Sequence, residues 1–180
     1  MTRWVMLLRG INVGGTGKLK MADLRALLQK LGAREVQTHV QSGNVVFSGL
    51  VDAAAFEEIV AGEIERAHGF RPRVLVIAEE DFREIVAGYP YPEAFEAPKT
   101  RHVWFLAGPG MPDLDAMTDL ATASERFEIT GRALYLHAPD GIARSKLAER
   151  AERLIGVPAT ARNLNTCQRL LELLDASADR

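Results

Sequence analysis

The chain has 180 residues, of which 47% are hydrophobic and 26% are charged, a balance typical of a folded globular protein rather than a disordered one. The formal net charge of −2 gives no bulk signal for a nucleic-acid partner, although 22 Lys and Arg residues leave room for a local basic patch. The one cysteine, Cys167, cannot form an internal disulfide, and no stretch approaches the roughly 18 apolar residues of a membrane span. We therefore expect a cytoplasmic protein with no membrane partner.

The first half of the chain predicts alternating strands and helices. Short apolar runs indicate strands, and apolar residues at helical spacing indicate helices. The expected elements are a strand at 5–8, a glycine-rich loop at 10–20, a helix at 21–31, strands at 35–40 and 45–47, a helix between Asp52 and Gly69, a strand at 74–78 and a helix at 80–87.

Residues 88–99 are predicted to link two domains. This stretch contains three prolines, which argue against a regular element. The expected domains are residues 1–87 and residues 100–180, and the second one includes a final helix at 164–174.

The second half repeats the beginning of the first. Residues 100–108 can be laid on residues 2–10 with five of nine positions identical, and the order strand, helix, strand, strand, helix follows both times. The expected fold class is α+β, with two ferredoxin-like halves of β-α-β-β-α-β type related by internal duplication, plus a C-terminal helix. The last strand of the second half is weakly marked near 158–161.

Three segments carry a family resemblance. They are Leu8-Arg9-Gly10-Ile11-Asn12-Val13-Gly14-Gly15, Gln41-Ser42-Gly43-Asn44-Val45-Val46-Phe47 and Thr160-Ala161-Arg162-Asn163-Leu164-Asn165-Thr166. With these segments the chain resembles the bacterial domain of unknown function 1697 family. The resemblance implies an α+β fold with an internal repeat of ferredoxin-like halves, and it implies no activity.

The glycine-rich loop is the first candidate site. Glycines let backbone N–H groups approach a ligand closely, and a following helix N-terminus favours an anion. The candidate ligand contacts here are Arg9, Asn12, Gly14, Gly15 and Lys18. Neither the P-loop pattern nor the Gly-x-Gly-x-x-Gly dinucleotide pattern fits. The alternative is a surface loop whose glycines only form tight turns.

Two further polar segments are candidate ligand contacts. Gln41, Ser42 and Asn44 lie on one turn, which is otherwise a hairpin connection with a positive φ at Gly43 or Asn44. Arg162 and Asn163 precede the last helix, where Asn163 is alternatively an N-cap for that helix. The sequence leaves open whether the three segments meet in one site.

The sequence identifies no catalytic residue, no metal site and no cofactor. The four histidines are isolated, and Cys167 lies on the apolar side of the final helix, where a buried inert thiol is expected. We expect a protein that binds a small anionic ligand, including phosphorylated ones. A nucleic-acid-binding module that stacks bases on strand aromatics (Trp4, Trp104, Phe105, Tyr135) and a protein-interaction module without a small ligand stay open as alternatives. The sequence does not decide whether the protein is an enzyme or what its oligomeric state is.

Overall fold

The computed structural model describes residues 2–92 and 97–178. By its contacts the chain divides into two compact units, the first made of residues 1–83 and 168–180 and the second of residues 84–167. The division differs from the sequence-based domains in two places, because it passes through helix α3 (Glu79–Ala87) and helix α6 (Leu164–Ala178). Part of the expected linker, residues 93–96, lies outside the described residues.

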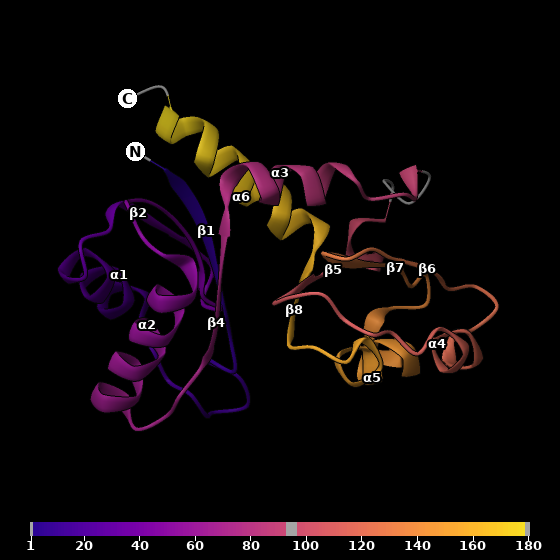
Figure 1. The fold of residues 1–180 in the computed structure, drawn as a ribbon. Coiled ribbons are helices and arrows are strands. Elements are labelled where there is room, and N and C mark those ends of the chain that lie inside the picture. The colour runs from indigo at the N-terminus through magenta and orange to yellow at the C-terminus, as the bar shows by residue number, and fades with distance from the viewer. Residues whose placement is uncertain (1, 93–96, 179–180) are drawn as a thin grey trace. The chain divides into compact units, whose positions relative to one another are not determined.

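Unit 1 is a four-stranded antiparallel sheet in the order β2-β3-β1-β4. The strands are β1 (Arg3–Arg9), β2 (Arg34–His39), β3 (Asn44–Ser48) and β4 (Arg73–Ala78). Helices α1 (Met21–Lys30) and α2 (Ala53–His68) lie on one face of this sheet (Figure 1). The expected strands and helices of this half are therefore present.

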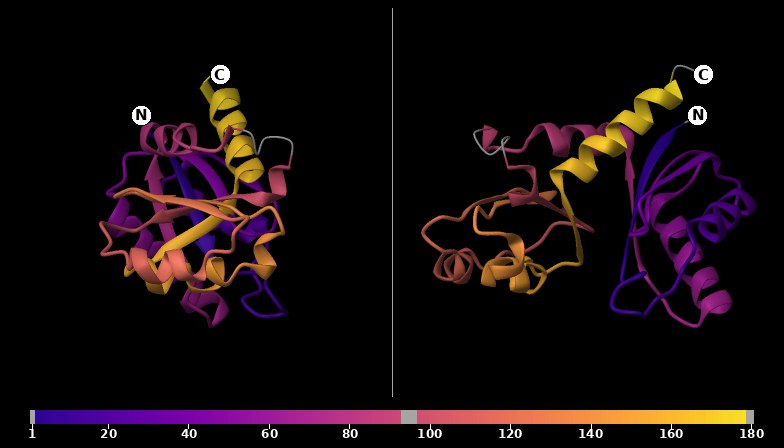
Figure 2. Two further views of the ribbon diagram at one scale, coloured as in Figure 1. Left: turned by 90° about the vertical axis from the view of Figure 1, so that its right-hand side faces the viewer. Right: turned by 180° about the vertical axis from the view of Figure 1, so that it is seen from behind.

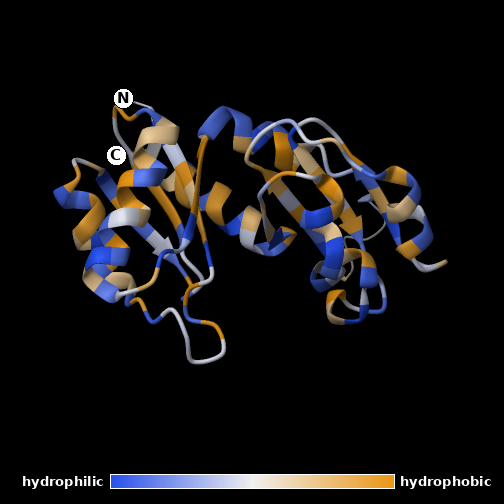
Figure 3. Cartoon of the chain, turned by 60° about the horizontal axis from the view of Figure 1, so that its bottom comes forward, coloured by the Kyte–Doolittle hydropathy of each residue, from blue (hydrophilic) through white to orange (hydrophobic). Residues whose placement is uncertain are grey.

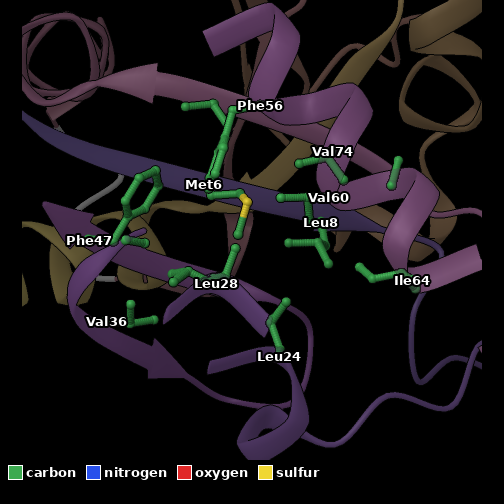
Figure 4. Close-up of a cluster of buried hydrophobic side chains, with 14 of the residues drawn as sticks. Met6, Leu8, Leu24, Leu28, Val36, Phe47, Phe56, Val60, Ile64 and Val74 are labelled. Atoms are coloured by element: carbon green, nitrogen blue, oxygen red, sulfur yellow. The ribbon is translucent and has the colours of Figure 1, made fainter. Parts of the chain in front are cut away.

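The core of unit 1 forms between that face and the two helices. Alternate residues of β1 point into it, among them Met6 and Leu8, where they meet Leu24 and Leu28 of α1 and Val60 of α2 (Figure 4). The remaining labelled core residues in that figure are Val36, Phe47, Phe56, Ile64 and Val74. The other residues of β1, including Arg3 and Arg9, point to the opposite face because side chains alternate along a strand.

Local signals at the helix ends explain why α2 begins and stops where it does. The Asp52 carboxylate accepts a hydrogen bond from the Ala55 amide at 2.8 Å, and Gly69 closes the helix in the left-handed conformation at φ 75°. In unit 2, Ser145 and Gly156 bound helix α5 (Lys146–Ile155) in the same way. Orange and blue segments alternate along the helices in Figure 3, as expected for elements with one buried side.

Unit 2 has the same sheet arrangement, with the order β6-β7-β5-β8 and antiparallel pairing throughout. Its strands are β5 (Arg101–Leu106), β6 (Arg126–Ile129), β7 (Ala133–His137) and β8 (Ala159–Asn163). Helices α4 (Leu114–Leu120) and α5 lie together on one face of the sheet (Figure 2). The fold class is thus α+β with two similar halves. The weakly marked last strand exists and extends to Asn163.

Candidate functional site

The loop between β1 and α1 projects beyond the end of the unit 1 sheet (Figure 1), and the side chain of Asn12 organises it. The Asn12 amide donates to the carbonyl oxygen of Leu19 at 2.8 Å, and its Oδ1 accepts from the Leu19 amide at 2.9 Å. The backbone amide of Asn12 donates to the Gly17 carbonyl oxygen at 2.9 Å. These bonds close the loop at a narrow neck.

Gly17 makes this neck possible. A Cβ at Gly17 would lie 2.3 Å from the Gly10 carbonyl oxygen, which is far inside van der Waals contact. Only glycine therefore fits where the outgoing and returning chains touch. Arg9 and Lys18 flank the neck, one on each chain.

The tip of the loop is a tight turn. The Thr16 amide donates to the Val13 carbonyl oxygen at 3.0 Å, and Gly14 and Gly15 between them have φ values of 58° and 80°. Two consecutive positive φ angles are typical of a type I′ turn. The alternative role of these glycines, to form tight turns, is thus realised in the structure. The turn leaves the backbone amides of Gly14 and Gly15 without a hydrogen-bond acceptor in the part of the chain that the structure describes.

The loop and the Gln41–Asn44 turn lie in contact. The Asn12 side-chain amide donates to the Gln41 carbonyl oxygen at 2.7 Å, and the Leu8 amide donates to the Gly43 carbonyl oxygen at 2.9 Å. Two of the three polar segments identified in the sequence therefore meet at one end of the unit 1 sheet.

Within the turn, Asn44 is buried and its side-chain amide donates to the His39 carbonyl oxygen at 3.1 Å and to the Ser42 hydroxyl at 2.9 Å. Gly43 is the residue with positive φ, at 75°. Asn44 itself is the first residue of β3 and β2 ends at His39, so the turn covers residues 40–43, one position earlier than the sequence suggested.

A cross-strand arginine pair lies beside the neck. The β1–β4 register places Arg73 directly opposite Arg9, and both side chains are exposed on the sheet face away from α1 and α2. On the other side, β1 pairs with β3 as far as Leu7 and Asn44, and the Leu8 amide donates to the Gly43 carbonyl oxygen, so the Gln41–Asn44 turn adjoins this end of β1. Sequence reasoning missed Arg73, because only the strand register reveals what lies opposite Arg9.

The local charge at this end of the sheet is positive. Residues 9–20 and 41–44 contain three cationic side chains (Arg9, Lys18 and Lys20) and no Asp or Glu. Helix α1 begins here without a side-chain hydrogen bond to its first turn, since Lys20 occupies the N-cap position. Cationic side chains and free helix N–H groups both favour an anion.

The third polar segment belongs to unit 2. The Asn163 Oδ1 accepts a hydrogen bond from the Thr166 amide at 2.9 Å. This is the helix N-cap that the sequence analysis gives as the alternative role of Asn163. Arg162 lies in β8 opposite Val103, and its guanidinium donates to the Ala161 carbonyl oxygen at 2.8 Å.

Cys167 is not placed to act as a nucleophile. Cys167 is fully buried, and burial raises the pKa of its thiol to about 12, so the thiolate that would attack a substrate is strongly disfavoured. Within residues 2–92 and 97–178, no group of three His, Cys, Asp or Glu side chains is placed to hold a metal ion.

The comparisons with known proteins agree with this architecture. Residues 1–135 match the family described as "Protein of unknown function (DUF1697)", and the chain belongs to this family. Its fold is shared with the structure of the conserved bacterial protein SP0830 from Streptococcus pneumoniae, with a TM-score of 0.67 and 23% identity over 96% of this chain and 98% of that one. No curated protein matches the chain. No helix in the described part of the chain is long and apolar enough to cross a membrane.

Proposed function

We propose that unit 1 binds a small anionic ligand, such as a phosphorylated molecule, at the end of its sheet where the glycine-rich loop meets the Gln41–Asn44 turn. The observation that carries the proposal is the cross-strand pair of Arg9 and Arg73 beside this loop. Two guanidinium groups on neighbouring strands can grip phosphate oxygens in a bidentate way.

The loop supplies rigidity and hydrogen-bond donors for this role. Hydrogen bonds at both its neck and its tip restrict its shape before any ligand arrives, so little ordering would be needed on binding. The amides of Gly14 and Gly15 and the ammonium of Lys18 are the donors we assign to the ligand. The Ser42 hydroxyl, on the turn that the loop contacts, is a further candidate donor.

Asn12 takes a different role in this proposal from the one suggested by the sequence. Both of its amide hydrogens and its oxygen are used within the protein. We therefore assign it to holding the loop against the turn, and we assign ligand contact to its neighbours. Arg162 and Asn163 lie in unit 2 and form no part of this proposed site.

Titration calorimetry with inorganic phosphate and pyrophosphate tests the proposal. Arg9→Gln and Arg73→Gln are each expected to weaken binding by about tenfold, since each removes one charge-assisted contact. Lys30→Gln is the matched control, because Lys30 is an exposed cation at the other end of α1. The proposal fails if neither anion binds, or if Lys30→Gln weakens binding as much as the arginine variants do.

The nucleic-acid alternative has less support from the side chains that would stack on bases. Trp104, Phe105 and Tyr135 are buried, and the half-buried Trp4 donates its indole N–H to the Gly49 carbonyl oxygen at 3.0 Å. If mixed single-stranded RNA nevertheless binds at low salt, its affinity must fall steeply as salt is added. Such binding, together with no response to pyrophosphate, would favour the alternative.

For the architecture we propose two ferredoxin-like halves that arose by internal duplication. The equivalent strand orders of the two sheets and the five identities between residues 2–10 and 100–108 support this proposal. We also propose that the protein is bacterial and acts in the cytoplasm, where its one buried thiol would stay reduced.

A further inference from the structure

Unit 2 contains a cavity of about 430 Å³ between the end of helix α3 and the hairpin of β6 and β7. Glu84, Ile85 and Gly88 line it from the helix side, and the other lining residues belong to the hairpin (Glu128, Thr130, Gly131, Arg132, Tyr135). All of them belong to unit 2, so the cavity is formed within one compact unit. Its volume falls within the range of cavities that hold small molecules.

The floor of the cavity is fixed by Tyr135. Its hydroxyl donates to the Ile85 carbonyl oxygen at 2.8 Å, and its ring meets the Tyr89 ring edge-on at 6.0 Å. A Cβ at Gly88 would lie 2.9 Å from the Tyr135 hydroxyl oxygen, so a glycine is needed where the chain leaves the helix. The Tyr135 side of the cavity is therefore held in shape by buried contacts before anything binds, while the residues around its mouth are exposed.

The rim of the cavity is acidic. Glu128 lies directly opposite Tyr135 in the β6–β7 register, so its side chain shares the face of the tyrosine. It forms no ion pair with any residue in the described part of the chain. Glu84 stands on the helix side and pairs with Arg132 at 3.0 Å. Two carboxylates and one guanidinium leave the lining with a net charge of −1.

The last turn of α3 also lines the cavity, and helix C-termini favour cations. Burial raises the pKa of Tyr135, and the negative charges of Glu128 and Glu84 raise it further, against the opposing effect of Arg132. The two carboxylates are thus close enough to Tyr135 to raise the pKa of its hydroxyl.

We propose that this cavity binds an organic cation, an ammonium or guanidinium group on a short aliphatic chain. Glu128 would accept the charged head, the apolar part of the lining would hold the chain, and the negative face of the Tyr135 ring would add a cation–π contribution. In the free protein the Arg132 guanidinium donates a hydrogen bond to the Glu84 carboxylate. Arg132 therefore competes with a cationic ligand for the carboxylates of the cavity. The site lies in unit 2 and is independent of the anion site proposed in unit 1.

The test is a titration of the ¹⁵N-labelled full chain with 1,4-diaminobutane and with agmatine, followed through backbone amide shifts. 1,4-Butanediol serves as the uncharged probe of similar length. We expect both cations to shift the Gly88 and Gly131 amides saturably, and we expect the diol to leave them unchanged. Glu128→Gln is expected to weaken binding about fivefold, and Arg132→Gln to tighten it by a similar factor.

Glu149→Gln is the matched control, since Glu149 is an exposed carboxylate on α5 in the same unit and outside the cavity lining. It is expected to bind the cations as the unmodified protein does. The proposal is overturned if the cations do not shift these amides, if Glu128→Gln binds as tightly as the unmodified protein, or if pyrophosphate shifts the same amides.

Discussion

At the scale of single residues, Asn12 shows that a polar side chain in a candidate ligand-binding loop can serve to hold the protein together. The sequence indicated an asparagine in a glycine-rich loop as a ligand contact. In the structure this residue has a φ of 52°, a conformation that asparagine adopts more readily than most residues. Two of its three side-chain hydrogen bonds close the loop onto Leu19, and the third joins the loop to Gln41 in the next turn. The tertiary structure therefore decides which hydrogen-bond donors of the loop remain available to a ligand.

His102 leads to a prediction about pH. Burial lowers the pKa of this histidine from 6.5 to about 4 in the folded protein, so the folded state favours the neutral ring. As the pH falls, the unfolded chain takes up the proton first. The stability contributed by neutral His102 is complete above pH 6.5 and is lost between pH 6.5 and pH 4, by roughly 3 kcal/mol at 1.36 kcal/mol per pKa unit.

Urea unfolding of the unmodified protein and of His102→Gln at pH 7 and pH 4 checks this prediction. The substitution removes the titrating ring, so the variant is expected to lose less stability on acidification. The stability advantage of the unmodified protein should shrink by roughly 3 kcal/mol between the two pH values. An advantage that is the same at both values would contradict the burial argument.

At the scale of elements, the hairpin between β2 and β3 depends on Gly43 for two separate reasons. Its φ of 75° is unfavourable for other residues, and a Cβ would lie 2.6 Å from the Leu8 Cβ and 2.7 Å from the Ile11 Cδ1. We expect Gly43→Ala to lower the free energy of unfolding by about 3 kcal/mol, since overpacking adds to backbone strain.

Gly69→Ala provides the control for the Gly43 prediction. Gly69 has the same φ of 75°, but nothing lies within 4 Å of a Cβ at this position. Backbone strain alone should lower the free energy of unfolding by about 1 kcal/mol. Chemical unfolding of both variants separates the two effects, and equal losses would show that the close approach to Leu8 and Ile11 relaxes at little cost.

The helices and strands themselves were largely predictable, because their signals are local. Asp52, Gly69 and Ser145 act at helix ends through neighbouring backbone groups. Strand β8 was the weakest prediction, since its residues lack a continuous apolar run. It forms because β5 offers a hydrogen-bonding partner, and this pairing extends the strand beyond the expected residues 158–161 to include Arg162.

At the scale of the whole molecule, the two units provide separate cores and separate candidate sites. A ligand stabilises the folded form of the unit that holds its site. We expect pyrophosphate to slow amide exchange in β1, β3 and β4 and to leave β5 and β7 unchanged, while 1,4-diaminobutane does the reverse. Hydrogen exchange read by mass spectrometry measures both responses. Uniform slowing across the chain would mean that the two units open together.

The sequence by itself determined the order of the elements, the caps of the helices and the α+β class, because each depends on residues close together in the chain. It also placed Arg9, Lys18 and the Gln41–Asn44 turn among the candidate residues. Only the tertiary structure paired Arg9 with Arg73 and brought Glu84 to the hairpin that carries Glu128 and Arg132. The physical reason is that hydrogen-bond register and packing across elements decide which distant side chains become neighbours, and neither leaves a local pattern in the sequence.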